Sequence, residues 1–174
     1  DKIRGRVGRI EFKEASEIIM KIAEGMQVAH EQNLIHRDLK PSNILYNMQR
    51  KTVKIIDFGT GKKMHVEQSI TQQGYVVGTP YYMSPEQCQG FPLDPRCDIY
   101  SLGATFYHLV TGTVPFDKPD AMQTLYAHVY EAVPWPPSYY GVVPPQIRHI
   151  ISRMMAKKTK RSEERRVGKE CRSR

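Results

Sequence analysis

Apolar residues recur at helical spacing in two segments of the chain. In residues 14–32 they stand at steps of three and four: Ile18, Ile22, Met26 and Ala29. In residues 145–157, which begin at Pro145, four apolar residues fall on one predicted face: Ile147, Ile150, Ile151 and Met154. Such spacing is typical of amphipathic helices, and proline is favoured at a first helical position. Both segments are therefore predicted to be helices.

Residues 98–112 are apolar on nearly every side, which predicts a helix buried all round. We expect it to begin at Asp98, a residue type suited to capping a helix N-terminus, and to end before Gly112. Residues 120–131 are compatible with a further helix, and the Pro-rich residues 133–145 with a surface connector. No internal repeat is visible.

Two short apolar runs, residues 44–46 and 52–56, flank a turn and predict a β-hairpin. Residues 57–97 hold few periodic apolar positions and many turn-forming residues. A span of that length without helices or strands is usually functional when it lies inside a compact domain. The predicted fold class is mainly α, with one small β-hairpin.

Polar residues crowd the stretch "IHRDLKPSNILYN" at residues 35–47. Asn43 opens the first predicted strand and Asp57 closes the second, so an antiparallel pairing brings their side chains together. Two oxygen ligands are too few for a calcium cage, but they suit Mg²⁺, which takes further ligands from water and substrate phosphates. Asp38 could accept a proton from a hydroxyl there, and Lys40 could neutralise a transferred group. The pattern predicts phosphoryl transfer.

Several ordered motifs resemble those of protein kinases. "HRDLKPSN" fits the catalytic loop, "DFG" follows at residues 57–59, and "GTPYYMSPEQ" at 78–87 resembles the segment ending in A-P-E, with Ser84 in place of alanine. "DIYSLG" resembles the start of the family's central helix. Lys40 and Thr79 are typical of serine/threonine kinases, and the sequence of residues 78–112 resembles those of bacterial members of the family. The resemblance covers residues 1–160 and implies the large, C-terminal lobe of the kinase fold.

This resemblance implies a role for each polar residue around the hairpin. Asp38 would be the catalytic base, and Lys40 would contact the γ-phosphate of ATP. Asn43 and Asp57 would hold Mg²⁺, and Leu45 would lie under the adenine ring. The cofactors implied are ATP and Mg²⁺.

The resemblance also implies supporting contacts around the catalytic loop. His36 would stack with Phe58 of the Asp57-Phe58-Gly59 motif, in the packed column that sets the active state. Asp98 would accept backbone N–H groups from the catalytic loop.

The resemblance also implies roles in regulation, in peptide docking and in a structural ion pair. Arg37 would pair with a phosphorylated residue, either Thr71 or Ser69, and Thr79 would line the substrate groove. Glu86 would pair with an arginine that follows the "MMAK" run. The first arginine after that run is Arg161, and it is the first residue of the C-terminal segment 161–174, whose composition differs from that of the rest of the chain.

The kinase family also needs G-x-G-x-x-G-x-V over the phosphates, a strand lysine in V-A-I-K and a helix glutamate. None of them occurs in this sequence. We therefore interpret residues 1–160 as the large lobe of a serine/threonine kinase domain, with the small lobe absent, and expect it to be inactive alone. Two alternatives stay open: a pseudokinase-type binding module and a small-molecule phosphotransferase.

Residues 161–174, "RSEERRVGKECRSR", have almost no apolar residues. They resemble the translation of a short-read sequencing adapter, and we predict a non-native, disordered tail. The chain's net charge of +8 falls to +5 without them. The remainder shows no basic helix face interleaved with aromatic residues, which favours a mildly basic surface over nucleic-acid binding.

Cellular context follows from the cysteines and from the apolar runs. The chain has three cysteines, an odd number, and they lack CxxC spacing: Cys88, Cys97 and Cys171. This predicts a reducing compartment, without disulfides and without a zinc site. No apolar run reaches the roughly 18 residues of a membrane span. We expect a cytoplasmic kinase domain that acts on Ser/Thr-containing proteins. This expectation does not extend to a membrane anchor in other parts of the protein.

Overall fold

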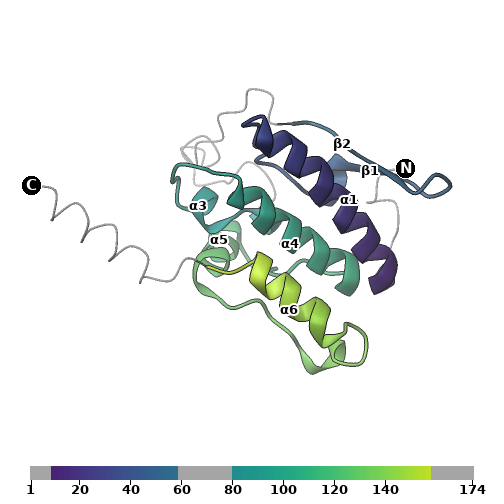
Figure 1. Ribbon diagram of the computed structural model, residues 1–174. Helices are drawn as coiled ribbons and strands as arrows, with labels where there is room; N and C mark the ends of the chain where they lie inside the picture. Colours follow the sequence, from purple (N-terminus) through teal and green to yellow (C-terminus); the bar gives the residue numbers. More distant parts are fainter. Residues whose placement is uncertain (1–8, 59–79, 158–174) are drawn as a thin grey trace, which may run out of the picture.

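The computed structural model describes residues 9–58 and 80–157, which are coloured in Figure 1. These residues are mostly helical and contain a two-stranded antiparallel sheet, as predicted for a kinase large lobe. The elements are, in chain order, α1 (Phe12–Glu31), η2 (Pro41–Asn43), β1 (Ile44–Asn47), β2 (Thr52–Ile55), η3 (Pro80–Tyr82), α3 (Pro85–Cys88), α4 (Arg96–Thr111), α5 (Ala121–Tyr130), η4 (Pro137–Tyr139) and α6 (Pro145–Met154).

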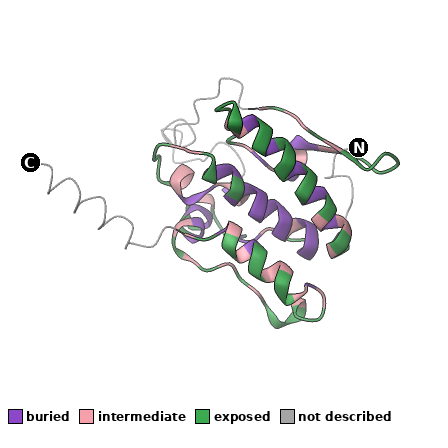
Figure 2. Cartoon of the chain, viewed as in Figure 1, coloured by how far each residue is buried: buried purple, intermediate pink, exposed green. Residues whose placement is uncertain are grey.

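Helix α4 lies in the middle of the structure, between α1 and α6 (Figure 1). Thirteen of its 16 residues are buried, whereas α1 and α6 each expose an outer side (Figure 2). The prediction of a helix buried all round is confirmed. The helix ends at Thr111, before Gly112, as predicted; the left-handed φ of 81° at Gly112 is a conformation that glycine adopts without steric cost.

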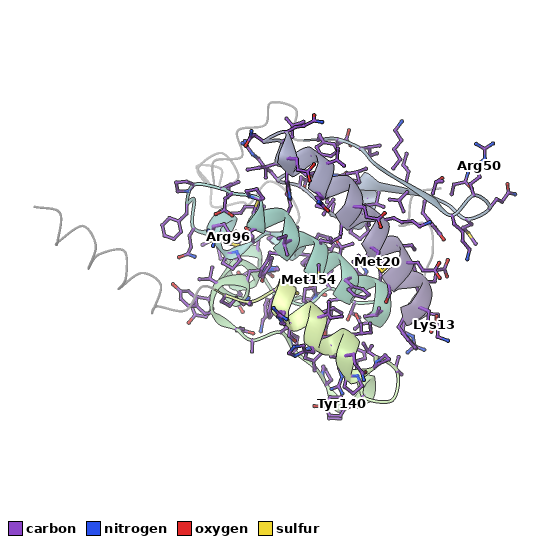
Figure 3. The ribbon with its side chains drawn as sticks, viewed as in Figure 1. Lys13, Met20, Arg50, Arg96, Tyr140 and Met154 are labelled. Atoms are coloured by element: carbon purple, nitrogen blue, oxygen red, sulfur yellow. The ribbon has the colours of Figure 1, made fainter. Side chains whose placement is uncertain are left out.

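Helix α1 buries the face that its sequence predicts. The four residues of that face are all less than 10% exposed: Ile18, Ile22, Met26 and Ala29. Met20 is 60% exposed and Lys13 is exposed as well; both are labelled on α1 in Figure 3. The first turn is capped by Glu11, whose carboxylate accepts the Lys13 N–H at 2.9 Å.

Helix α6 begins at Pro145, as predicted, but its buried strip is narrower than expected. Ile151 is fully buried, while Ile150 is 45% exposed, so its assignment to the buried face was wrong. The main neighbour of α6 is α4, and one neighbour covers only a narrow stripe of a helix. The two helices meet closely at Gly103, beside Met154 (Figure 3).

The start of α4 also differs from the sequence prediction. The helix begins at Arg96 after Pro95, and Asp98 is its third residue instead of its cap. The carboxylate of Asp98 accepts from another segment of the chain, so a local pattern could not reveal its use. Residues 57–97 are likewise not free of structure, because η3 and α3 lie within them.

The predicted hairpin is confirmed, with strands of four residues each. Ile44 pairs with Ile55, and the Ile56 N–H continues the ladder by donating to the Asn43 carbonyl at 3.0 Å. Strand β2 packs against α1, which fixes the hairpin relative to the helices. Among the described residues, no helix is both long and apolar enough to cross a membrane.

Candidate active site

The buried carboxylate of Asp98 holds the loop that carries the candidate catalytic residues. Its Oδ2 accepts the His36 N–H at 2.9 Å and its Oδ1 accepts the Arg37 N–H at 2.8 Å. Asp98 is 1% exposed, so these bonds form out of contact with water. Hydrogen bonds to a charged group contribute about 1.5–3 kcal/mol each. The contacts expected of Asp98 are therefore present, and they tie the loop to α4.

The ring of His36 links the catalytic loop to the segment after β2. His36 is fully buried, and its ring centroid lies 4.8 Å from that of Phe58, at a tilt of 56°. The Asp38 N–H donates to His36 Nδ1 at 3.3 Å, which leaves the proton on Nε2 to be donated to the Ile56 carbonyl at 3.0 Å. The expected contact between His36 and Phe58 is present as a tilted pair.

Asp38, Lys40 and Asn43 form one polar cluster. Lys40 Nζ lies 2.8 Å from Asp38 Oδ2, and Asn43 Nδ2 donates to the same oxygen at 3.1 Å. Asn43 Nδ2 also donates to the Asp38 backbone carbonyl at 2.8 Å. Asn43 is 6% exposed, so its amide has a fixed orientation in which the nitrogen faces Asp38. Its amide oxygen is then the atom left for another group.

The expected metal ligands flank the hairpin, with one difference in register. Asn43 ends η2 directly before β1, and its backbone partner across the hairpin is Ile56, one residue before Asp57. Asp57 is exposed and has a left-handed φ of 59°. Residues 9–58 and 80–157 contain no group of three or more His, Cys, Asp or Glu side chains placed to hold a metal ion. Metal binding through Asn43 and Asp57 therefore remains a prediction.

For two other predicted site residues, the structure gives a position but no contact that bears on the predicted role. Leu45 is half-buried in β1, and Arg37 is exposed with a left-handed φ of 67°. Four predicted site residues lie outside the described part of the chain, as does the tail at 161–174: Gly59, Ser69, Thr71 and Thr79.

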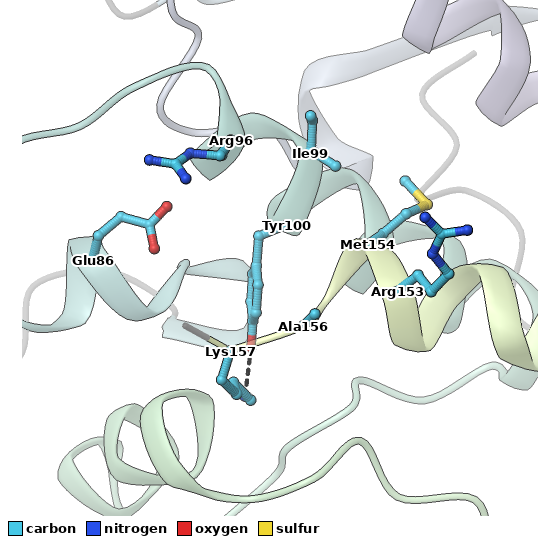
Figure 4. Close-up of a pocket in the computed structure, with 8 residues that line it drawn as sticks. All are labelled: Glu86, Arg96, Ile99, Tyr100, Arg153, Met154, Ala156 and Lys157. Atoms are coloured by element: carbon cyan, nitrogen blue, oxygen red, sulfur yellow. Dashed lines mark hydrogen bonds between the residues drawn. The ribbon is translucent and has the colours of Figure 1, made fainter. Parts of the chain in front are cut away.

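Glu86 lines a cavity of about 290 Å³ between α3, α4 and the end of α6 (Figure 4). The cavity is also lined by three basic residues: Arg96, Arg153 and Lys157. Lys157 Nζ donates to Tyr100 Oη at 2.9 Å, and burial lowers the pKa of Lys157 to about 8. The arginine partner expected for Glu86 lies outside the described residues, so that pairing remains a prediction.

Sequence reasoning missed two contacts around the site, one to Asp98 of α4 and one to Arg37 of the catalytic loop. His30 Nε2 lies 2.8 Å from Asp98 Oδ2, and Gln87 Nε2 donates to the Arg37 carbonyl at 2.6 Å. The partners are 68 and 50 residues apart, so no local pattern indicates either contact. A signal for the local role of Gln87 was available, because Ser84-x-x-Gln87 has the spacing of a helix capping box.

The sequence of the chain is similar to those of known proteins. The family model of the protein kinase domain matches residues 1–168. Serine/threonine-protein kinase Pkn1 of Myxococcus xanthus is 39% identical over 144 residues, which are 81% of this chain and 21% of that protein. Serine/threonine-protein kinase PknB of Mycolicibacterium smegmatis is 37% identical over 152 residues, which are 86% of this chain and 24% of that protein.

A third relative, serine/threonine-protein kinase PknA of Mycobacterium tuberculosis, is 37% identical over 152 residues, 87% of this chain and 34% of that protein. The chain thus spans about a fifth to a third of the length of these curated relatives. The motifs, the loop anchored on Asp98 and the family match lead to one conclusion. The chain belongs to the protein kinase family and is similar to the serine/threonine kinases of bacteria.

Proposed function

We propose that the protein containing this chain transfers the γ-phosphate of ATP to Ser and Thr hydroxyls of proteins. The observation that carries the proposal is the cluster at Asp38, in which one carboxylate oxygen receives both the Lys40 ammonium and the Asn43 amide. A carboxylate held in this way has a fixed direction from which it can accept a proton. Its second oxygen, Oδ1, is the atom that we assign to the substrate hydroxyl.

Each residue of the cluster has a separate task in this proposal. Asp38 orients the attacking hydroxyl and takes its proton, while Lys40 offsets negative charge on the transferred phosphoryl group. Asn43 holds Asp38 through its amide nitrogen. Phosphoryl transfer depends mostly on positioning and charge stabilisation, so the fixed backbone of the loop is part of the catalytic equipment.

The residues present fit the Mg²⁺ that the family implies. The Asn43 amide oxygen and the exposed Asp57 carboxylate are hard oxygen donors, which suit Mg²⁺ and leave room for phosphate and water ligands. When bound, the ion supplies charge neutralisation at the phosphates. Leu45 of β1 would contact the adenine ring from below.

We further propose that residues 1–160 are the large lobe of a kinase domain that is completed by other parts of a longer protein, and that 161–174 are a non-native tail. The short coverage of the relatives supports the first part. The protein substrates, the cytoplasmic location and the lack of nucleic-acid binding belong to the same proposal. Arg37 would receive a phosphate on Thr71 or Ser69, a modification that carries about −1.5 to −2 charge.

The test uses the full-length kinase with protein and peptide substrates, and with an aminoglycoside and choline as small-molecule acceptors. We expect phosphate on Ser or Thr of the protein substrates and none on the small molecules. Asp38→Asn should abolish turnover and leave the melting temperature near that of the wild type. Asp57→Asn should raise the Mg²⁺ concentration that half-maximal activity requires, because the ion loses a carboxylate ligand.

Two results would contradict the proposal. Phosphorylation of the small molecules in place of the proteins would assign the chain to a small-molecule phosphotransferase. ATP binding without any transfer, unchanged by Asp38→Asn, would assign it to a binding module.

A further inference from the structure

The side-chain amide of Gln87 makes two separate contacts, one through its oxygen and one through its nitrogen. Its Oε1 accepts the Ser84 N–H at 3.0 Å, while Ser84 Oγ accepts the Gln87 N–H at 3.4 Å. Together these bonds form a capping box at the start of α3. The cap needs only the oxygen of the Gln87 amide, so the nitrogen is available for a second task.

That nitrogen reaches the catalytic loop. Gln87 Nε2 donates to the Arg37 carbonyl at 2.6 Å, and the Arg37 N–H donates to Asp98. Both backbone polar groups of Arg37 are thus held by side chains, one from α3 and one from α4. Arg37 has a φ of 67°, which is costly for a residue with a β-carbon and is retained only where surrounding contacts impose it.

The Arg37 carbonyl belongs to the same peptide unit as the Asp38 N–H. That N–H donates to His36 Nδ1 at 3.3 Å. A peptide unit is planar, so holding its oxygen and its N–H fixes the whole plane. The Asp38 side chain departs from the next atom along the backbone. Its direction therefore depends on the Gln87 contact.

We propose that Gln87 is a positioning residue, which connects the segment that ends in α3 to the catalytic base Asp38. The segment at 78–87 resembles the peptide-docking segment of kinases, and the Gln87 contact fastens its end to the backbone of the loop. The inference rests on the proposed function, because it assigns Gln87 a part in the same reaction. It predicts that an ordered docking segment and a correctly directed base occur together.

The experiment compares two chemically identical changes in the full-length kinase. Gln87→Glu keeps an oxygen for the capping box but puts a carboxylate oxygen in place of the nitrogen that donates to Arg37. Gln89→Glu adds the same charge two residues later, where the Gln89 amide donates to the carbonyl of Pro85 at the start of α3 and, within the part of the chain that the structure describes, makes no contact with the catalytic loop. Gln87→Met carries no charge and cannot donate to Arg37, but it also removes the capping-box oxygen. An equal fall in kcat in Gln87→Glu and Gln87→Met therefore assigns the effect to the lost bond to Arg37, which is the one change the two variants share.

We expect kcat, measured per active site by titration, to fall about 3- to 10-fold in Gln87→Glu and Gln87→Met, as a hydrogen bond of ordinary net strength implies. The KM for ATP should stay within twofold of the wild type, since the metal and nucleotide residues are untouched. Gln89→Glu should keep the wild-type kcat. A purely structural contribution of Gln87 would lower the melting temperature and leave kcat per active site unchanged.

Hydrogen–deuterium exchange of residues 34–41 supplies a readout that does not depend on activity. We expect faster exchange in both Gln87 variants than in Gln89→Glu. Equal exchange in all variants, or faster exchange with unchanged kcat in an active kinase, overturns the inference. If exchange responds but the wild type phosphorylates no protein, the proposed function fails, and with it the catalytic role of Gln87.

Discussion

Asp98 decides the geometry of the candidate site more than any other single residue. Its carboxylate accepts two backbone N–H groups of the catalytic loop and lies 2.8 Å from His30 Nε2. Buried donors that lose their partner carry their full desolvation cost, about 1–3 kcal/mol each. The loop geometry therefore depends on a carboxylate side chain that follows His36 by 62 residues and Arg37 by 61 residues in sequence.

Replacing Asp98 tests this dependence. We expect Asp98→Ala to lower the free energy of unfolding by about 2–5 kcal/mol, because the N–H groups of His36 and Arg37 lose their acceptor. Asp98→Asn, which keeps one acceptor oxygen, should lose less. Urea denaturation followed by circular dichroism measures both values.

The control for Asp98→Ala is the same substitution at Glu17, an exposed carboxylate. Glu17 lies 3.7 Å from Lys51, and its side chain is 52% exposed. Exposed ion pairs contribute about 0–1 kcal/mol, so Glu17→Ala should change the free energy of unfolding by less than about 1 kcal/mol. Equal losses for Asp98→Ala and Glu17→Ala would show that the Asp98 carboxylate does not hold the loop.

His128 predicts a pH dependence of stability. It is fully buried between Tyr100 and Phe116, and burial, aided by the charge of Lys157, lowers its pKa from 6.5 to about 3. Between these values the unfolded chain binds a proton that the folded chain does not. Stability should therefore fall as the pH drops below 6.5, by up to about 1.4 kcal/mol per pH unit from this residue.

The variant His128→Asn isolates this contribution. Its amide oxygen can accept the Tyr100 hydroxyl, which in the wild type lies 2.9 Å from His128 Nδ1, but it does not titrate. Urea midpoints between pH 4 and pH 6.5 should decline less steeply in this variant than in the wild type, whatever its stability at neutral pH. The same substitution at His149, which is exposed, controls for the change of side chain itself. Equal slopes for wild type and His128→Asn would contradict the assignment.

Helix packing sets different limits on two glycines in helices. A β-carbon at Gly103 of α4 would lie 2.8 Å from Met154 Cβ and 2.9 Å from Met155 Cγ, both on the α6 side. A β-carbon at Gly25 of α1 would lie 3.5 Å from Ile55 Cδ1, an ordinary van der Waals distance. The first glycine thus permits a helix contact, whereas the second only weakens its own helix.

The two alanine variants should change stability in opposite directions. Gly103→Ala should lower the free energy of unfolding by about 1–3 kcal/mol, because α4 and α6 must move apart. Gly25→Ala should raise it by about 0.5–1 kcal/mol through helix propensity. Thermal and urea unfolding measure both changes. If Gly103→Ala raised the free energy of unfolding, α6 would be able to shift away from the added methyl group without loss of stability.

Sequence patterns predicted the elements well wherever one face of an element meets the core. The buried face of α1 follows directly from its spacing, and α4, which is apolar on nearly every side, was predicted to be buried all round. Ile150 was placed wrongly because spacing does not reveal how many neighbours a helix has. The contacts of Asp98 and Gln87 join segments 50 or more residues apart. Only family motifs anticipated the first of them, and nothing anticipated the second.

At the scale of the whole molecule, the chain combines a well-formed catalytic loop with an incomplete set of kinase motifs. Asp38, Lys40, Asn43 and Asp57 are present, but the sequence contains neither the glycine-rich phosphate loop nor the V-A-I-K lysine. Those absent parts hold the phosphates of ATP in line for transfer. Loss of one contact of this kind costs on the order of 10²- to 10³-fold in kcat.

We therefore expect residues 1–174, purified alone, to fold around α4 and yet to have no kinase activity. Peptide phosphorylation should not exceed that of an Asp38→Asn control, and calorimetry at millimolar nucleotide should show no saturable ATP binding. Circular dichroism and a cooperative thermal transition establish that the protein tested is folded. The full-length kinase, assayed in parallel, should show activity that Asp38→Asn abolishes. Asp38-dependent turnover by residues 1–174 would contradict the prediction, because the large lobe would then position ATP without the glycine loop or the strand lysine.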